Sequence, residues 1–181
     1  MALLTVADAK AQFDILSAES DSQLQEYIDA LTAVIERHVG PVEQREFTQT
    51  IQGRGQTMCL SHIPAVALVK VTPALPAGDD LDLSGLFLDT SKGIVHRQSG
   101  TFAGTHWSVT YTAGRDEIPP TIRLAALLLL QHLWRTKNGP ARGRGTSDDF
   151  DVTEQLAGYS YAVPNRVLHL LEPYKLPPGV A

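Results

Sequence analysis

The sequence predicts an α+β fold in which a small antiparallel sheet is inserted between two helical parts. Residues 5–39 repeat apolar side chains at helical spacing. Residues 42–112 hold short runs of β-branched side chains between glycines and prolines. Residues 118–137 form a long helix that is apolar on nearly every side. We therefore expect an N-terminal helical hairpin, a small antiparallel β-sheet insertion, a long apolar helix, a short C-terminal helix and an extended tail.

Two helices are expected at the N-terminus. Thr5, followed three residues later by Asp8, is a capping-box pattern that predicts the start of a short first helix. Ser20 or Asp21 caps a second helix that ends at Gly40. The apolar stripe of this second helix consists of Leu24, Ile28, Leu31 and Ile35. We expect the two helices to pack against each other as a hairpin.

The middle of the chain predicts five or six short strands. The triplet Gly53-Arg54-Gly55 is typical of a hairpin turn. The expected strands are 46–52, 57–60, 66–72, 86–89, 93–96 and 105–112, with 73–85 as a loop. In the last strand Trp107, Val109 and Tyr111 alternate onto one face, which predicts that this face lies against a core.

The long helix begins at Pro119 or Pro120, where a missing N–H group costs nothing. Its apolar side chains fall on three arcs, namely Ile122, Ala125, Ala126, Leu129 and Leu133; Leu127, Leu130 and Trp134; and Leu124 with Leu128. A helix this apolar has more surface to bury than a small domain covers. It therefore points outward as well as inward.

The second arc, Leu127, Leu130 and Trp134, is the candidate subunit interface. The alternative is that the sheet and the first two helices of the same subunit cover these side chains. Under the interface hypothesis, Trp134→Glu leaves the monomer folded but blocks its assembly with further subunits.

The part that follows the long helix loses this regular pattern. Residues 138–150 are rich in glycine and charge, which predicts a flexible loop. Arg142 and Arg144 in this loop could contact a polyanion, although a solvated linker is the simpler interpretation. A short helix is expected over 163–171 and an extended tail over 173–181, all within a single domain, 1–181.

Composition limits the kinds of partner. The formal net charge of −5 argues against a chain that grips nucleic acid mainly through its phosphates. The longest apolar run, 124–130, is far shorter than the roughly 20 residues that cross a bilayer, so no membrane span is expected. The single cysteine, Cys59, excludes an internal disulfide, and its apolar neighbours predict a buried thiol.

The sequence offers no assembled chemistry. Its 6 histidines never pair at a spacing of four residues, and there is no second cysteine to provide metal-ligand spacing. No Gly-x-Ser-x-Gly motif supports a serine hydrolase. We therefore assign no catalytic, cofactor-binding or metal-binding residues and do not expect an enzyme. An active site would require groups such as His96, His106 and an acidic residue to converge from distant parts of the chain.

The order of several short motifs resembles the head-tail connector (adaptor or head-completion) proteins of long-tailed bacteriophages. These motifs are 3–10, Val39-Gly40, 62–66, 109–114 with Ile118-Pro119-Pro120 before the leucine-rich helix, and the closing segment 170–175. The resemblance covers most of the chain. The arginine-glycine loop and residues 146–162 depart from the family pattern and inherit nothing from it.

The resemblance implies a structural virion protein at the head-tail junction, assembled in the host cytoplasm. Such adaptors form a ring, usually of twelve copies, under the portal protein of the filled head. The implied partners are further copies of the chain, the portal, a downstream neck or tail-completion protein, and double-stranded DNA that passes through during packaging and ejection. No cofactor and no membrane are implied.

Two further sets of residues are candidates under this resemblance. Tyr174, Lys175 and Leu176 are candidates for docking to the portal or neck, and Arg142 and Arg144 for contact with DNA in the channel. Two other functions stay open. The chain could be another neck or tail-completion protein, such as a stopper or tail terminator, or a small ligand-binding module with a pocket between the sheet and the long helix.

Overall fold

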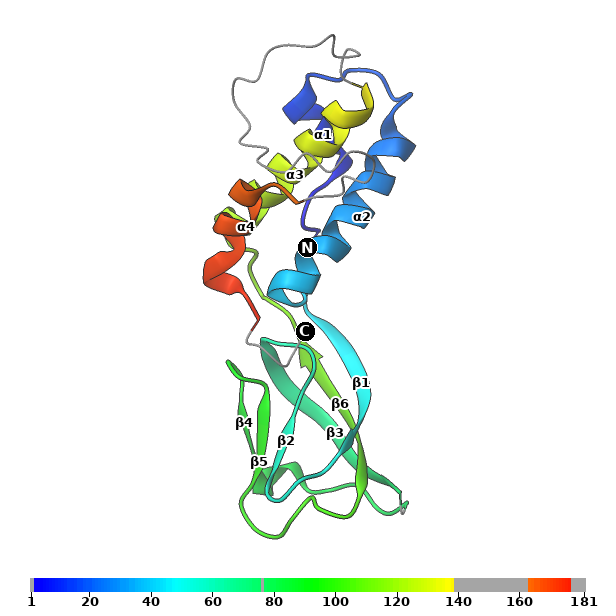
Figure 1. The fold of residues 1–181 in the computed structure, drawn as a ribbon. Coiled ribbons are helices and arrows are strands. Elements are labelled where there is room, and N and C mark those ends of the chain that lie inside the picture. Colours follow the sequence, from blue (N-terminus) through cyan, green and yellow to red (C-terminus); the bar gives the residue numbers. More distant parts are fainter. Residues whose placement is uncertain (1, 76, 139–162, 177–181) are drawn as a thin grey trace. The chain divides into compact units, whose positions relative to one another are not determined.

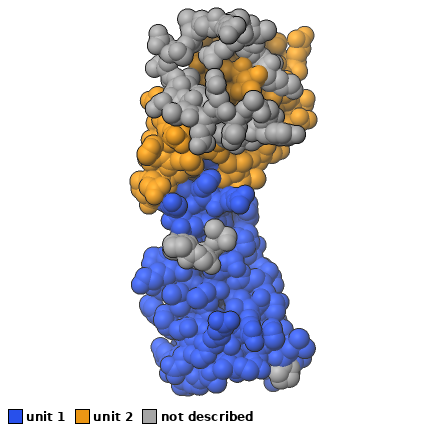
Figure 2. Space-filling view, viewed as in Figure 1, with its two compact units in different colours: residues 1, 35–118, 174–181 blue, residues 2–34, 119–173 orange. Residues whose placement is uncertain are grey.

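The computed structural model describes residues 2–75, 77–138 and 163–176 (Figure 1). The chain forms two compact units (Figure 2). The sheet unit contains Ile35–Ile118 and Tyr174–Ala181 together with Met1, and the helical unit contains Ala2–Val34 and Pro119–Pro173. The expected α+β class is confirmed. The single connector-type domain over 1–181 stays a prediction.

Both N-terminal helices begin as expected, and the second also ends as expected. Helix α1, Val6–Phe13, starts at Thr5, whose hydroxyl accepts a hydrogen bond from the backbone N–H of Asp8. The carboxylate of Asp8 accepts the N–H of Thr5 at 2.9 Å, which completes the predicted capping box. Helix α2, Asp21–Val39, carries the predicted buried stripe and ends before Gly40.

Helix α1 packs mainly against α3, Pro120–Asn138, so the predicted hairpin of the first two helices is wrong. The ring of Phe13 stacks on Trp134 of α3 with 5.4 Å between centroids. Asp8 lies 3.9 Å from Arg123 of α3. An ion pair between Lys10 and the first residue of α2, Asp21, connects α1 to α2. The apolar partner of the short helix is therefore one distant in sequence.

The C-terminal helical segment follows the prediction closely. Helix α4, Asn165–Leu171, begins after Pro164 and packs against α3. Val167 and Leu171 are its buried residues. A 3₁₀ turn, η2, covers Glu172–Tyr174 where the extended tail was expected to begin. None of the helices in the described ranges is long and apolar enough to cross a membrane.

The described residues of the sheet unit form two three-stranded antiparallel sheets, and these six strands agree with the expected five or six. The first has the order β1-β6-β3, with β1 Arg45–Gln52, β6 His106–Ala113 and β3 Ala65–Leu75. The second has the order β2-β5-β4, with β2 Thr57–Cys59, β5 Ile94–Arg97 and β4 Leu86–Asp89. A short 3₁₀ turn, η1 Leu83–Gly85, precedes β4.

One core holds the sheet unit together. The predicted alternation in β6 is confirmed, because Trp107, Val109 and Tyr111 are all buried. They pack in one cluster with Met58 of the second sheet and Val71 of β3. Strand β3 is longer than expected and runs through Pro73, because it lies at the edge of its sheet, where proline is tolerated.

Candidate functional site

Helix α3 buries most of the surface that the sequence left unexplained. Ile122, Ala125, Ala126 and Leu129 of the first arc are buried, as predicted. Leu130 of the second arc is fully buried as well. The prediction that it lies on an outer face, as part of the subunit interface, is therefore wrong. Leu130 lies beside the first arc on the helix surface. Helical periodicity gives the angular position of a residue, but not how much of the helix circumference the rest of the subunit covers. Leu127 is half-buried and stays a candidate.

Trp134 contributes to the core of its own subunit. Its half-buried indole stacks on Phe13 at an interplanar angle of 15°. It also makes a T-shaped contact with Tyr27 of α2, with 6.2 Å between the ring centroids. These partners belong to the first two helices, which the sequence analysis named as the alternative cover for this side chain. Only the remaining exposed part of Trp134 is open to a partner.

The outward arc of α3 is instead the third one. Leu124 is 49% exposed, and Leu128 one turn later is half-buried. Continuing along the same side, Gln131 is half-buried and Arg135 is exposed. A leucine pair followed by an arginine therefore forms the accessible side of this helix.

Replacing Trp134 with glutamate is expected to lower the free energy of unfolding by about 2–4 kcal/mol, because a carboxylate would enter the space between two aromatic rings. This replaces the expectation of an intact monomer. Leu124→Glu places the same charge on the exposed side of the same helix and should cost less than about 1 kcal/mol. Urea unfolding of both variants measures the difference, and equal losses would show that Trp134 does not support the monomer.

The C-terminal end of α2 is held by Arg115, which follows β6. Its guanidinium donates to the carbonyl oxygen of Val39 at 2.8 Å and to that of Pro41 at 3.2 Å. The last carbonyl groups of a helix lack intrahelical donors. A cation near them also interacts favourably with the negative end of the helix dipole. Burial lowers the pKa of Arg115, and the nearby Tyr174 opposes this shift. Arginine stays charged at neutral pH, so the contact is a charged cap.

Two residues of the C-terminal segment, Tyr174 and Leu176, also contact the end of α2 or its cap, Arg115. The Arg115 guanidinium lies 5.8 Å from the ring centroid of Tyr174. The N–H of Leu176 donates to the carbonyl oxygen of His38 at 2.9 Å. Of the three docking candidates, Tyr174 and Leu176 are therefore half-buried against the sheet unit, and Lys175 is exposed. Their role in docking to the portal or neck stays a proposal.

Sequence reasoning missed Arg115. Gly114 before it has a φ of +124°, and a Cβ there would overlap the carbonyl oxygen of Glu43. A glycine followed by arginine at the end of a buried strand was the available signal. Its importance depends on the end of α2 reaching the same place, which local sequence does not reveal.

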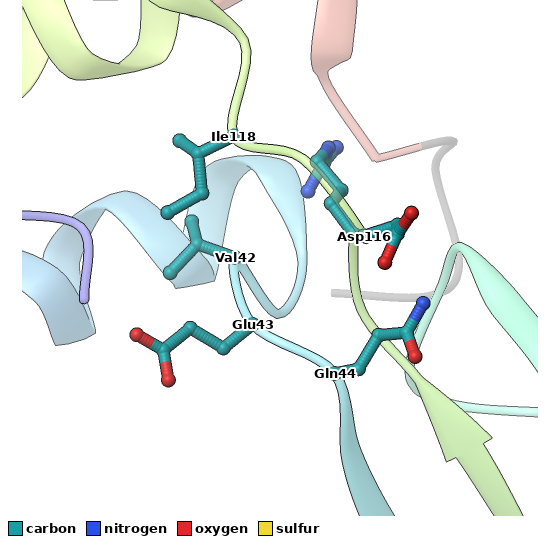
Figure 3. Close-up of a pocket in the computed structure, with 6 residues that line it drawn as sticks. Val42, Glu43, Gln44, Asp116 and Ile118 are labelled. Atoms are coloured by element: carbon teal, nitrogen blue, oxygen red, sulfur yellow. The ribbon is translucent and has the colours of Figure 1, made fainter. Parts of the chain in front are cut away.

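A small pocket of about 190 Å³ lies beside this cap, lined by Val42, Glu43, Gln44, Arg115, Asp116 and Ile118 (Figure 3). Figure 3 shows the side chains of Glu43 and Asp116 pointing to opposite sides. The two carboxylates therefore do not face each other across the pocket.

A second polar cluster surrounds His62. Its ring stacks on Phe47 with 3.9 Å between centroids. Its backbone N–H donates to the hydroxyl of Tyr111, and its Nδ1 lies 3.1 Å from the same oxygen. Burial is the main cause that lowers the pKa of His62, and the charge of Arg45 adds to it. The sheet unit therefore favours the neutral ring.

Acidification is expected to destabilise the protein through His62. Since its folded-state pKa lies below the ordinary value near 6.5, the unfolded chain binds more protons, and stability is lost as pH falls from about 6.5 through the folded-state pKa. His62→Gln should reduce the loss between pH 7 and pH 5. Burial also lowers the pKa of His132, so part of the loss should remain. Urea unfolding at both pH values tests this, and an unchanged loss would contradict the assignment.

Cys59 is exposed, so the prediction of a buried thiol is wrong. Met58 beside it is buried, because successive side chains of a strand point to opposite faces. A strand as short as Thr57–Cys59 carries too few residues for its buried face to be predicted. Across the described ranges, no group of three or more His, Cys, Asp or Glu side chains could hold a metal ion.

Three of the predicted features fall where the structure gives no description. Arg142 and Arg144 lie outside the described residues. The same holds for residues 139–150 of the expected flexible loop and for 177–181 of the expected tail.

Comparison with known proteins gives one family and one fold. The family model described as "Head completion protein" matches residues 2–176. No curated protein matches the chain. A chain in the virion of a native gene transfer agent (GTA) particle is 19% identical and superposes with a TM-score of 0.67, covering 99% of this chain and 94% of that one.

Two chains from particle necks are similar. One, from the neck of an empty GTA particle computed with C6 symmetry, is 18% identical with a TM-score of 0.66, and the match covers 97% of this chain and 90% of that one. The other, from the neck of a native GTA particle computed with C12 symmetry, is 18% identical with a TM-score of 0.63, and the coverage is 98% and 93%. At this identity the likeness shows the shared fold.

Proposed function

Because the chain belongs to the head completion protein family, we propose that it is a structural adaptor that joins a DNA-filled head to the neck or tail of a phage-like particle. The family match over residues 2–176 is the observation that carries this function. The predicted connector family is thereby confirmed. A head-to-tail structural role follows from the family and places the protein in the virion.

A homo-oligomeric ring is the form in which the adaptor acts under this proposal. Support comes from chains of the same fold in necks computed with C6 and C12 symmetry. Twelve copies under the portal, with a downstream neck or tail-completion protein on the other side, is the arrangement that we propose. The net charge of −5 suits a channel that DNA must leave again. Arg142 and Arg144 remain proposed contacts with that DNA.

Binding to purified neighbours tests the adaptor role. The full-length chain, mixed with the portal protein of its own particle, is expected to comigrate with the portal in size-exclusion chromatography. Comigration with the end of the tail tube and not with the portal would identify a tail terminator instead. A chain that stays monomeric with both neighbours would contradict the adaptor role.

A further inference from the structure

The outward side of α2 in the helical unit carries two carboxylates and three small residues. Its exposed residues there are Ser22, Glu26, Asp29, Ala30 and Ala33, which we call the acidic face, and the exposed Arg37 continues the same side of the helix one turn further. Glu26 and Ala33 lie directly opposite the buried stripe of the same helix. Small alanines beside carboxylates leave room for larger side chains of a partner.

The outward side of α3 has the opposite character. Leu124, Leu128, Gln131 and Arg135, which we call the leucine-arginine face, run along one side of this helix. Leu124 is 49% exposed and is the most exposed large apolar residue in the described part of this helix. Arg135 adds a positive charge at one end.

The two faces cannot meet within one copy. Tyr27 of α2 contacts Trp134 of α3, so the two helices share the core of the helical unit. Each outward face lies opposite its own buried stripe and therefore points away from that core. Within the described part of the chain, neither Glu26 nor Arg135 forms an ion pair. Among the described residues, Glu26 and Arg135 therefore have no partner of opposite charge.

We propose that the acidic face of one copy docks on the leucine-arginine face of the next copy, and that repetition of this contact closes the ring. This contact rests on the proposed function, because it requires neighbouring copies. An interface between two different patches is the kind that generates rings. The complementary charge and size of the two faces favour a second copy of this chain as the occupant.

The spacing of the residues matches between the two faces. Glu26 and Ala33 are seven residues apart on α2, as are Leu128 and Arg135 on α3, which corresponds to roughly 10 Å along each helix. Figure 1 shows that α2 and α3 run in opposite directions within the helical unit. A rotation of roughly 30° between neighbours in a twelvefold ring keeps them nearly antiparallel. When Leu128 then lies against Ala33, Arg135 lies against Glu26.

A charge swap tests the contact in assembled particles. The quantity measured is the number of copies per portal, by quantitative mass spectrometry of purified particles. Glu26→Arg and Arg135→Glu should each lower it at least tenfold, since like charges then face each other, and the double variant should restore it to within threefold of the unmodified chain. Asp79→Arg and Arg54→Glu, exposed positions in the sheet unit, are matched controls that should assemble normally.

Cross-linking tests the register independently of charge. Cys59→Ser removes the only cysteine, and Ala33→Cys with Leu128→Cys then places one thiol on each face. A short bis-maleimide added to particles should produce a ladder of covalent multimers. The pair Ala33→Cys and Thr48→Cys, which places the second thiol on the exposed side of β1, should not produce it.

The outcomes separate this contact from the proposed function. If particles contain a ring of the chain, but both charge reversals assemble normally and the cysteines do not cross-link, the contact is wrong and the adaptor role stands. The contact is also wrong if the single reversals lower the number of copies per portal, the double variant does not restore it, and no ladder of cross-linked multimers forms. Particles that contain no ring of the unmodified chain overturn the proposed function itself.

Discussion

Replacing Gly40 with alanine is expected to lower the free energy of unfolding by more than about 3 kcal/mol. Gly40 ends α2 with a φ of +79°, a left-handed conformation that costs other residues about 1–2 kcal/mol. A Cβ at this position would also overlap the backbone carbonyl oxygen of Ile63, which cannot move aside as a flexible side chain can. Denaturant unfolding followed by circular dichroism measures the loss.

Gly104→Ala is the matched control for this variant. Gly104 has a φ of +80°, but no atom lies within 4 Å of the position of its Cβ. Its loss should therefore contain only the backbone strain, about 1–2 kcal/mol. Equal losses in the two variants would contradict the close approach of Gly40 to Ile63.

Replacing Arg115 with methionine is expected to cost about 2–4 kcal/mol in unfolding free energy. The substitution keeps most of the apolar bulk but removes the donors to the carbonyl oxygens of Val39 and Pro41. Arg115→Lys should recover part of the loss, because an ammonium group can still reach one carbonyl. Since the Tyr174 contact is lost as well, the amide of Leu176 should exchange hydrogen faster in the methionine variant.

Arg123→Met provides the comparison for the arginine variant. Its guanidinium lies 3.9 Å from Asp8 at a partly exposed position, so its removal should cost less than about 1 kcal/mol. A similar loss at positions 115 and 123, with unchanged exchange of Leu176, would show that Arg115 does not cap α2.

Local patterns predicted most elements of this fold. The Thr5 and Asp8 capping box, the buried stripe of α2 and the alternation in β6 each depend on residues close in sequence. Packing between distant segments was not accessible in the same way. Phe13 finds its stacking partner in Trp134, and nothing near either residue reveals this pairing.

The candidate site shows the same division. The order of short motifs predicted the family and the head-to-tail structural role, and both predictions are confirmed. Helical geometry placed the apolar residues of α3 on three arcs, but it did not show which arc the rest of the subunit covers. In the structure Leu130 is buried, whereas Leu124 and Arg135 are exposed.

A reconstruction of the head-tail junction in purified particles tests the adaptor role most directly. We predict a closed layer of copies of this chain, related by rotational symmetry, between the portal and the next neck or tail protein. A junction in which no such layer is present, or in which the layer consists of another protein, would contradict it.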